Sequence, residues 1–347
     1  MELNERIPAL LLPWYEENRR PLPWRADRIP YHVWVSEIMC QQTRTEAVKA
    51  YYARFLEALP DIAALAACPE EKLQKLWEGL GYYSRARNLK RAALVLMEKH
   101  GGVFPSDYPS IRALPGIGDY TAAAISSICF GLPCPAVDGN VLRLVTRLTA
   151  SGLDVAKAKT KAEVREALRP LYGGGRCGEL TQALMELGAL VCQPNHEPRC
   201  AVCPLRELCL SKAGLWKEIP FKSPPKPRRT ETHTVLLLCC GGAWALRKRA
   251  QTGLLAGLWE FPNVPGRLDA QAALDAADAL GCKPAAVLKQ TEKDHVFTHI
   301  RWELSAYVIE CRRRSEDLCW ADPAEIRRRY SLPTAFRQFM DELDKGE

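Results

Sequence analysis

Apolar residues recur at helical spacing through the first 216 residues of the chain, with short interruptions. Glycine and proline mark the joints between these segments, as at Gly101-Gly102 and at Pro133 with Pro135. The segments predicted to be helical are Trp34–Leu56, Glu71–Leu76, Arg85–His100, Tyr120–Phe130, Val141–Leu148, Lys161–Leu168 and Gly178–Val191. We therefore expect residues 1–216 to form a mainly α-helical region.

The pattern changes after this region. Ile219–Arg229 is rich in proline and cations, which predicts an extended linker over about residues 217–231. Thr232–Cys240, Gly241-Gly242 and Ala243–Lys248 then predict a β-hairpin. Further expected strand segments are Val296–Phe297 and Leu304–Val308, and the expected helix is Gln271–Leu280. We expect a separate α+β domain over residues 232–347.

Composition sets broad limits on the class of protein. A chain of 347 residues with 47% apolar residues favours two folded domains. The net charge of +7 suits a polyanionic partner without demonstrating one. No apolar run approaches the roughly 18 residues of a membrane span, and the acidic N-terminus is unlike a signal peptide. We expect a cytoplasmic protein with no membrane association.

Four of the fourteen cysteines lie within one short stretch near the end of the helical region. Cys192, Cys200, Cys203 and Cys209 follow the spacing C-x7-C-x2-C-x5-C. Four soft thiolates so close in sequence suit a metal centre. The spacing alone leaves both zinc and an iron–sulfur cluster open.

Two short segments in the helical region suggest a DNA-binding and catalytic site. Gly116 and Gly118 bracket one apolar residue at a helix start, where exposed backbone N–H groups can bind phosphate. An ordinary capped joint between helices is the alternative. About twenty residues later, Asp138 stands before a helical segment. Asp138 is a good N-cap, and we expect it to be both cap and catalytic carboxylate.

We call the turn at Gly116 and Gly118 the glycine hairpin. Together, the cysteine spacing, this hairpin and the Pro-Ala-Val-Asp segment ending at Asp138 resemble the endonuclease III superfamily of DNA glycosylases. The first cysteine gap is one residue longer than in that superfamily. The resemblance implies a helix-hairpin-helix fold with one structural 4Fe-4S cluster on these four cysteines. It implies a six-helix subdomain over about residues 25–134 and an iron–sulfur subdomain over about 1–24 and 135–216.

The segment Ser36-Glu37-Ile38-Met39-Cys40-Gln41-Gln42-Thr43-Arg44 narrows the resemblance to the adenine glycosylase (MutY) family. On spacing alone, Glu37 is a glutamate favoured by the helix dipole. The resemblance instead implies that Glu37 is the acid that protonates adenine. Cys40 stands where leucine is usual in the family. The other roles implied by the resemblance are catalysis by Asp138, Tyr120 and Asn140, DNA contact by Gln42, Thr43, Gly116 and Gly118, and an adenine pocket with Trp24 and Arg25.

Tyr120 separates two kinds of relative. Members that also cut the strand carry lysine at this point of the hairpin, because an amine is needed for a Schiff base. A tyrosine therefore predicts a monofunctional glycosylase. We expect the target base to be flipped out of the duplex before it reacts.

The C-terminal domain resembles Nudix-like domains at Gly257-Leu258-Trp259-Glu260-Phe261-Pro262. The helix after it lacks the R-E-x-x-E-E motif of active Nudix hydrolases, which predicts a binding module. Phe297, Thr298 and His299 resemble the family's F-S-H loop for 8-oxoguanine, with threonine in place of serine. Leu80 and Tyr82 resemble the residues of a second loop that contacts the same base.

The resemblance implies a monomeric enzyme that removes adenine paired with 8-oxoguanine or guanine in double-stranded DNA, in a bacterial nucleoid. Three alternatives stay open. They are a bifunctional pyrimidine glycosylase/lyase of the endonuclease III kind, a non-catalytic iron–sulfur DNA-binding protein, and a Nudix hydrolase.

Overall fold

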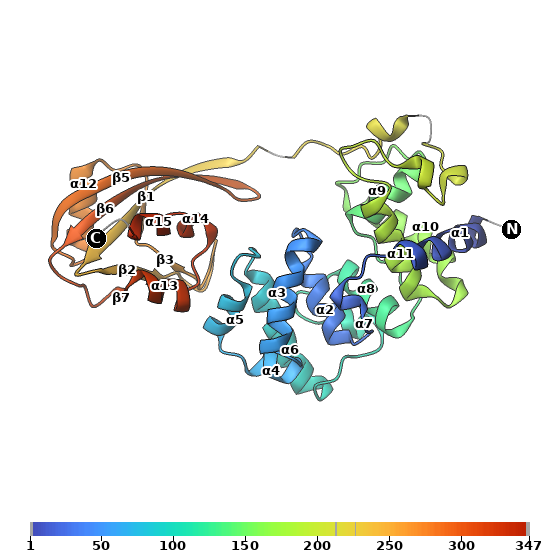
Figure 1. Ribbon diagram of the computed structural model, residues 1–347, viewed down its shortest axis with the longest axis horizontal. Helices are drawn as coiled ribbons and strands as arrows, with labels where there is room; N and C mark the ends of the chain where they lie inside the picture. The colour runs from blue at the N-terminus through green and yellow to red at the C-terminus, as the bar shows by residue number, and fades with distance from the viewer. Residues whose placement is uncertain (1–2, 212–213, 226, 345–347) are drawn as a thin grey trace. The chain divides into compact units, whose positions relative to one another are not determined.

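The computed structural model describes residues 3–211, 214–225 and 227–344. They form two compact units (Figure 1). The first unit comprises residues 1–68 and 87–224, and the second comprises residues 69–86 and 225–347. Among the described residues, no helix has the length and apolar character that crossing a membrane requires.

The first unit is helical, as the apolar periodicity predicts. Its helices are α1 (Leu3–Asn18), α2 (Pro30–Met39), α3 (Thr45–Ala58), α4 (Ile62–Ala67), α6 (Ser84–His100, which begins in the second unit), α7 (Tyr108–Arg112), α8 (Asp119–Phe130), α9 (Gly139–Leu148), α10 (Ala158–Leu168) and α11 (Cys177–Leu190). A buried apolar cluster joins α1 to α9, α10 and α11, with members such as Leu11, Val141 and Leu184. One end of the chain thus packs on a stretch more than 120 residues away.

One helical prediction was wrong. The segment Trp34–Leu56 is divided between α2 and α3 by a turn at residues 40–44. Gln42 has a φ of 60° in this turn, a left-handed conformation that no α-helix accommodates. The apolar pattern continues across the turn because both helices bury a face in the same unit, and so it conceals the break.

The second unit contains α5 (Glu70–Trp77) and a mixed sheet. The strand order is β3-β2-β1-β6-β5, with β4 on β1 and β7 on β2. The strands are β1 (Arg229–Cys240), β2 (Ala243–Lys248), β3 (Trp259–Glu260), β4 (Asn263–Pro265), β5 (Pro284–Val296), β6 (Ile300–Cys311) and β7 (Cys319–Ala321). The predicted hairpin is confirmed, since β1 and β2 pair antiparallel, whereas β1 and β6 pair parallel.

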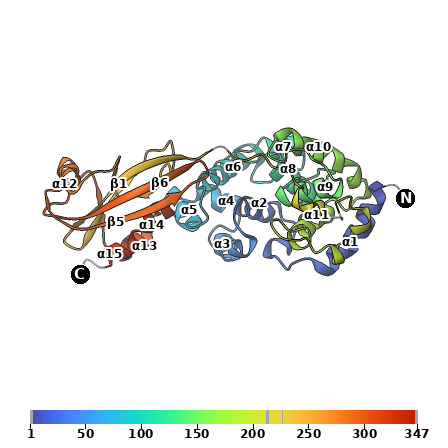
Figure 2. The same ribbon diagram turned by 90° about the horizontal axis from the view of Figure 1, so that it is seen from above.

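Helices cover both faces of this sheet (Figure 2). Val235 and Leu237 of β1 pack with residues of three short helices, and Leu236 and Leu238 pack with residues of α12 (Ala270–Ala279). The three short helices are α13 (Pro323–Arg329), α14 (Thr334–Arg337) and α15 (Met340–Leu343). A strand buried on both faces reads as a continuous apolar run, which is the pattern seen in β1. Helix α12 matches the predicted helix Gln271–Leu280 to within one residue at each end.

The expected linker is shorter than its sequence suggested. Residues 217–224 of the expected linker belong to the first unit, and Lys226 lies outside the described residues. The carbonyl of Phe221 accepts from the Val155 N–H at 3.0 Å, and the Ser223 N–H donates to Asp154 Oδ1 at 3.1 Å. Proline lacks a donor but still offers a carbonyl, and the non-proline residues between the prolines dock this segment on the helical unit.

Candidate active site

Glu37 and Tyr120 meet inside the first unit. Glu37 lies in the last turn of α2, and Tyr120 lies in the first turn of α8. The Tyr120 hydroxyl donates to Glu37 Oε2 at 2.6 Å. Helix α2 packs on α8, so each helix presents its polar side chain to the same site.

The Glu37 carboxyl is electrostatically unusual. Burial raises its pKa to about 7, and the negative charge of Asp138 acts in the same direction. The Tyr120 hydrogen bond and the Arg25 guanidinium lower the same pKa by smaller amounts. A carboxyl with a pKa near 7 can hold a proton at neutral pH and release it to a substrate.

Asp138 is the N-cap of α9. Its Oδ1 accepts from the Val141 N–H at 2.7 Å, and its Oδ2 accepts from the Asn140 side-chain amide at 2.8 Å. Burial raises the pKa of Asp138 above its usual value, although the Val141 and Asn140 hydrogen bonds lower it. The capping role expected of Asp138 is therefore observed, and the same side chain lies close enough to Glu37 to raise its pKa.

A chain of hydrogen bonds leads from Asp138 to the cysteine segment. Asn140 Oδ1 accepts from Arg143 Nη2 at 3.0 Å, and Arg143 Nε donates to the carbonyl of Cys192 at 2.8 Å. Arg143 Nη2 also donates to the carbonyl of Gly188 at 2.8 Å. Arg143 is 9% exposed, so these bonds are shielded from water. A buried arginine of this kind belongs to no sequence motif, so its role could not be predicted from the sequence.

The four predicted ligand cysteines line one cavity. Cys192, Cys200, Cys203 and Cys209 share it with apolar residues such as Leu144 and Trp216. Among the residues described, no three His, Cys, Asp or Glu side chains form a site for a single metal ion. Four thiols around one apolar cavity provide the donor set of an iron–sulfur cluster.

Arg147 ties this cysteine segment to α9. Its guanidinium donates to the carbonyls of Ile219 at 2.8 Å, Gln193 at 3.0 Å and Trp216 at 3.1 Å. The same group lies 3.5 Å from Cys192 Sγ. Arg147 is only 4% exposed, so its guanidinium donates to groups inside the unit and holds the cysteine segment against α9.

The glycine hairpin has the geometry that a close backbone approach requires. Gly116 has a φ of 76°, and a Cβ built there would lie 2.5 Å from Cβ of Asn88. Gly118 is the N-cap of α8. Asp119 follows it and pairs with Arg112 at 2.6 Å and with Arg165 at 3.4 Å. The exposed hairpin therefore presents a helix N-terminus, as a phosphate site needs.

Glu186 was missed by the sequence analysis. It is 1% exposed and lies on α11, where Arg20 Nε donates to its Oε1 at 2.7 Å and Arg25 Nη2 donates to its Oε2 at 2.7 Å. Burial alone would raise the pKa of Glu186, but the Arg20 and Arg25 hydrogen bonds lower it to about 2. This carboxylate holds Arg25 in place, and the Arg25 charge lowers the pKa of Glu37.

Trp24, the other residue predicted for the adenine pocket, packs edge-on against Tyr52, with ring centroids 5.3 Å apart.

Gln42 and Thr43 lie in the turn between α2 and α3. Gln42 is exposed, and its left-handed backbone is rare for a side chain with a Cβ. Thr43 is partly buried, and its N–H donates to the carbonyl of Cys40. Strain of this kind is found at sites that present a side chain to a ligand.

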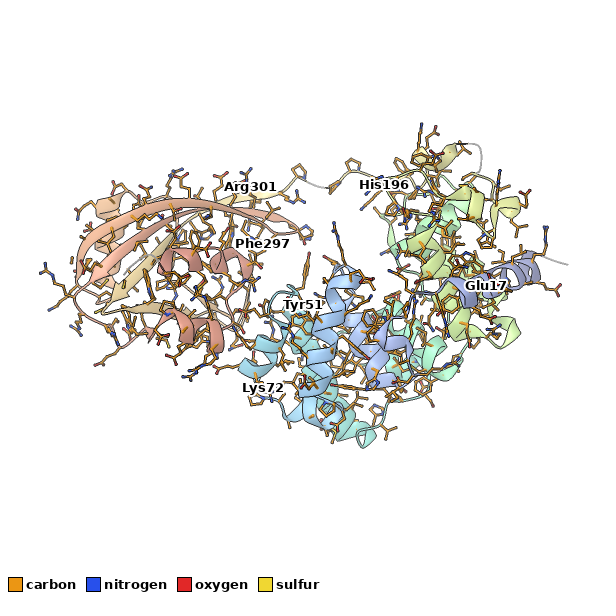
Figure 3. All side chains as sticks on the ribbon, in the orientation of Figure 1. Glu17, Tyr51, Lys72, His196, Phe297 and Arg301 are labelled. Carbon is orange, nitrogen blue, oxygen red and sulfur yellow. The ribbon has the colours of Figure 1, made fainter. Side chains whose placement is uncertain are left out.

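Two further predicted segments meet in the second unit. Phe297, Thr298 and His299 form the tip of the β5–β6 hairpin, which we call the hairpin tip (Figure 3). Residues 79–83, which we call the glycine loop, follow Glu78, the C-cap of α5. The hydroxyls of Tyr82 and Thr298 lie 2.6 Å apart. Tyr82 is 47% exposed, whereas Leu80 is 5% exposed, so Tyr82 offers more surface to a ligand.

The candidate catalytic residues therefore belong to the first unit, and the candidate recognition residues belong to the second. The first unit brings together Glu37, Tyr120, Asp138, Asn140 and Arg25. The second unit brings together Tyr82 and the hairpin tip.

Family comparisons cover both parts of the chain. Residues 35–170 match the HhH-GPD superfamily of base excision DNA repair proteins, and residues 233–342 match the NUDIX domain. The expected helix-hairpin-helix glycosylase fold and the Nudix-like domain are therefore confirmed.

Two solved structures resemble the helical region. A thermostable thymine-DNA glycosylase has a TM-score of 0.55 and 28% identity, covering 60% of this chain and 96% of its own. A non-covalent complex of endonuclease III with DNA has a TM-score of 0.51 and 24% identity, covering 61% of this chain and 97% of the other, which shows the fold alone.

Relatives that match most of this chain carry the same name. The adenine DNA glycosylase of Mus musculus is 34% identical over 358 residues, covering 86% of this chain and 69% of the relative. That of Schizosaccharomyces pombe is 31% identical over 373 residues, covering 86% of this chain and 80% of the relative. With the glycosylase fold and the acid–carboxylate pair described above, these identities establish that the chain belongs to the adenine DNA glycosylase family.

Proposed function

We propose that this enzyme hydrolyses the N-glycosidic bond of adenine paired with 8-oxoguanine or guanine in double-stranded DNA. The observation that carries the proposal is the Glu37 carboxyl, whose burial raises its pKa to about 7 beside Tyr120 and Asp138. Removing a purine requires a proton for the leaving base and a negative charge beside the developing sugar cation. Glu37 and Asp138 provide these two roles.

The reaction follows from these positions. Adenine, flipped from the duplex, receives a proton on its ring from Glu37. The bond from the base to the anomeric carbon then breaks, and its electron pair leaves with adenine. Asp138 stabilises the oxocarbenium-like sugar. A water molecule then adds to the anomeric carbon to supply the new hydroxyl, and its released proton returns to the Glu37 carboxylate. Asn140 holds the Asp138 carboxylate in place by donating to Oδ2.

Tyr120 supports a reaction that stops at the abasic site. A phenol cannot form the Schiff base through which a lyase cuts the strand. Its hydroxyl is instead committed to Glu37 at 2.6 Å. The proposal is therefore a monofunctional glycosylase, and the bifunctional alternative lacks its amine at this position. We also propose that it acts as a monomer, a state on which Tyr120 does not bear.

Cys192, Cys200, Cys203 and Cys209 would hold one 4Fe-4S cluster, since all four line one cavity. Such a cluster supplies structural order to a loop and not chemistry on the base. The Arg147 guanidinium binds three carbonyls of the same segment and fixes its path.

The hairpin tip and the glycine loop support recognition of the base opposite adenine. Thr298 keeps a hydroxyl that reaches Tyr82, and both side chains are exposed. The hairpin at Gly116 and Gly118 and the turn at Gln42 and Thr43 would contact the DNA backbone and stack.

The test is a glycosylase assay on duplexes that pair adenine with 8-oxoguanine, guanine or cytosine. Alkali converts abasic sites into strand breaks, so breaks that need alkali are the expected result, with cytosine the poorest partner. A parallel reaction with borohydride should trap no enzyme on DNA. Strand cleavage without alkali, or no adenine release from any pair, contradicts the proposal.

A further inference from the structure

The C-terminal end of helix α5 binds the backbone of residues 330–332 in the same unit. Glu78 Oε1 accepts from the Leu332 N–H at 3.1 Å, and Lys75 Nζ donates to the Tyr330 carbonyl at 3.3 Å. Lys75 and Glu78 also form an ion pair at 2.6 Å. We call Lys75 and Glu78, with the two backbone groups that they bind, the clamp.

The clamp is matched in charge and shielded from solvent. The cation meets a carbonyl oxygen and the anion meets an N–H, which is the stronger class of hydrogen bond on both sides. The side chains are 26% and 15% exposed, and Leu332 is 2% exposed. By contrast, the pair between Glu71 on the same helix and Lys248 is 61% and 37% exposed, and such a pair contributes little.

The segment that receives the clamp is itself fixed. The Trp259 N–H donates to the Ser331 carbonyl at 3.2 Å, and the Trp259 ring packs on Tyr330 with centroids 4.8 Å apart. Leu332 is part of the apolar core beneath the sheet. The clamp therefore anchors α5 to an ordered part of the unit.

The glycine loop begins at the residue after Glu78. Gly79, Gly81 and Tyr82 have φ values of 102°, 70° and 45°, so the loop occupies a conformation that needs support. Trp77 Nε1 donates to the Gly81 carbonyl at 3.0 Å, and Arg85 Nη2 donates to the Leu80 carbonyl at 2.9 Å. These two bonds hold the interior of the loop, and the clamp fixes Glu78, the residue from which the loop starts.

At its far end the loop reaches the hairpin tip through the 2.6 Å contact between Tyr82 and Thr298. That contact joins two exposed side chains and cannot hold the loop by itself. The clamp lies at the start of the loop, and the hydroxyl contact lies near its end.

We propose that Lys75 and Glu78 are positioning residues that hold Tyr82 in register with the hairpin tip, so that both contact the base opposite the adenine as one surface. This inference rests on the proposed function and deepens it. Under this proposal, discrimination between opposite bases also depends on two side chains that act through the position of Tyr82.

The test measures single-turnover adenine release from duplexes pairing adenine with 8-oxoguanine or with cytosine, in the intact protein. Glu78→Ala should lower the ratio of the two rates about tenfold, the value of one lost hydrogen bond to a charged group. The rate on the cytosine duplex should stay unchanged. Lys75→Ala should lower the ratio in the same direction.

Two controls separate positioning from general damage. Glu78→Gln keeps an oxygen that accepts from the Leu332 N–H and should restore most of the ratio. Glu71→Ala removes the same charge from the same helix and should leave the ratio unchanged.

A second readout does not need activity. Hydrogen exchange at the Leu332 amide should speed up in Glu78→Ala and not in Glu71→Ala, because only Glu78 covers that N–H. An unchanged ratio in Glu78→Ala overturns the inference, whether or not the amide loses protection. If the unaltered protein releases adenine from no duplex, the proposed function fails instead, while the amide measurement still tests the clamp.

Discussion

The Tyr120 hydroxyl donates to the Glu37 carboxyl at 2.6 Å, across 83 positions of sequence. The donation lowers a pKa that burial raises, and the result is a carboxyl that titrates at about 7. Tyr120 therefore lowers the pKa of the carboxyl that we propose as the acid of the reaction.

The rate of adenine release should fall as pH rises above about 7, because Glu37 then loses the proton that it must donate. In Tyr120→Phe the hydrogen bond that lowers the Glu37 pKa is gone, so the fall should begin at higher pH, by about one unit. Single-turnover rates measured at several pH values around 7 locate the fall in both proteins. If the fall in Tyr120→Phe occurs at the same pH as in the unaltered protein, or at lower pH, the assigned hydrogen bond is contradicted.

Glu37 should also reduce stability at high pH. Its folded pKa, about 7, exceeds its ordinary value of 4.5, so its contribution is fully present below pH 4.5 and is lost as pH rises through 7. Glu37→Gln should therefore be more stable than the unaltered protein above pH 7, by about 1–3 kcal/mol, and lose that advantage in acid. Denaturant unfolding at two pH values checks this, and equal stability at both would refute it.

Gly188 is predicted to tolerate no side chain. A Cβ there would lie 2.8 Å from Cβ and 2.9 Å from the carbonyl oxygen of Asn140. Gly188→Ala should cost about 1–3 kcal/mol and lower the excision rate by displacing the residue that orients Asp138. Gly174→Ala, where a Cβ meets nothing within 4 Å, is the matched control and should change stability by less than about 0.5 kcal/mol. Equal melting temperatures for the two variants contradict the prediction.

Arg147 should be irreplaceable by lysine. Lysine cannot reproduce donations to Ile219, Gln193 and Trp216 from one planar group, so Arg147→Lys should lose about 2–4 kcal/mol. We expect less iron bound per chain as well. Thermal unfolding and iron analysis measure these, with Arg169→Lys in an exposed pair as the control. Unchanged iron and stability would show that Arg147 does not hold the cysteine segment.

Much of the fold followed from local pattern. Val141–Leu148 and Arg85–His100 lie within observed helices, and Thr232–Lys248 is the observed hairpin. Short elements such as α4 and α7 left no detectable periodicity. The turn at residues 40–44 was hidden because apolar residues continue on both sides of it.

The site divides in the same way. Glu37 and Asp138 stand in recognisable motifs, and the structure brings them close enough for Asp138 to raise the Glu37 pKa. Glu186 stands in no recognisable motif, since its role depends on an ion pair with Arg20, 166 positions away in sequence. The clamp residue Glu78 was equally invisible, because its partner Leu332 contributes only a backbone N–H. Contacts of this kind arise from the fold and have no local sequence signature.

The central claim is that Glu37 supplies the proton for adenine release, and one comparison tests it. Single-turnover adenine release from an adenine:8-oxoguanine duplex is measured for the unaltered protein and for Glu37→Gln at pH 7, with duplex binding measured alongside. Glutamine keeps the acceptor for Tyr120 but has no acidic proton, so we predict unchanged binding and a rate lower by at least about a hundredfold. Equal release rates in the two proteins would contradict the account.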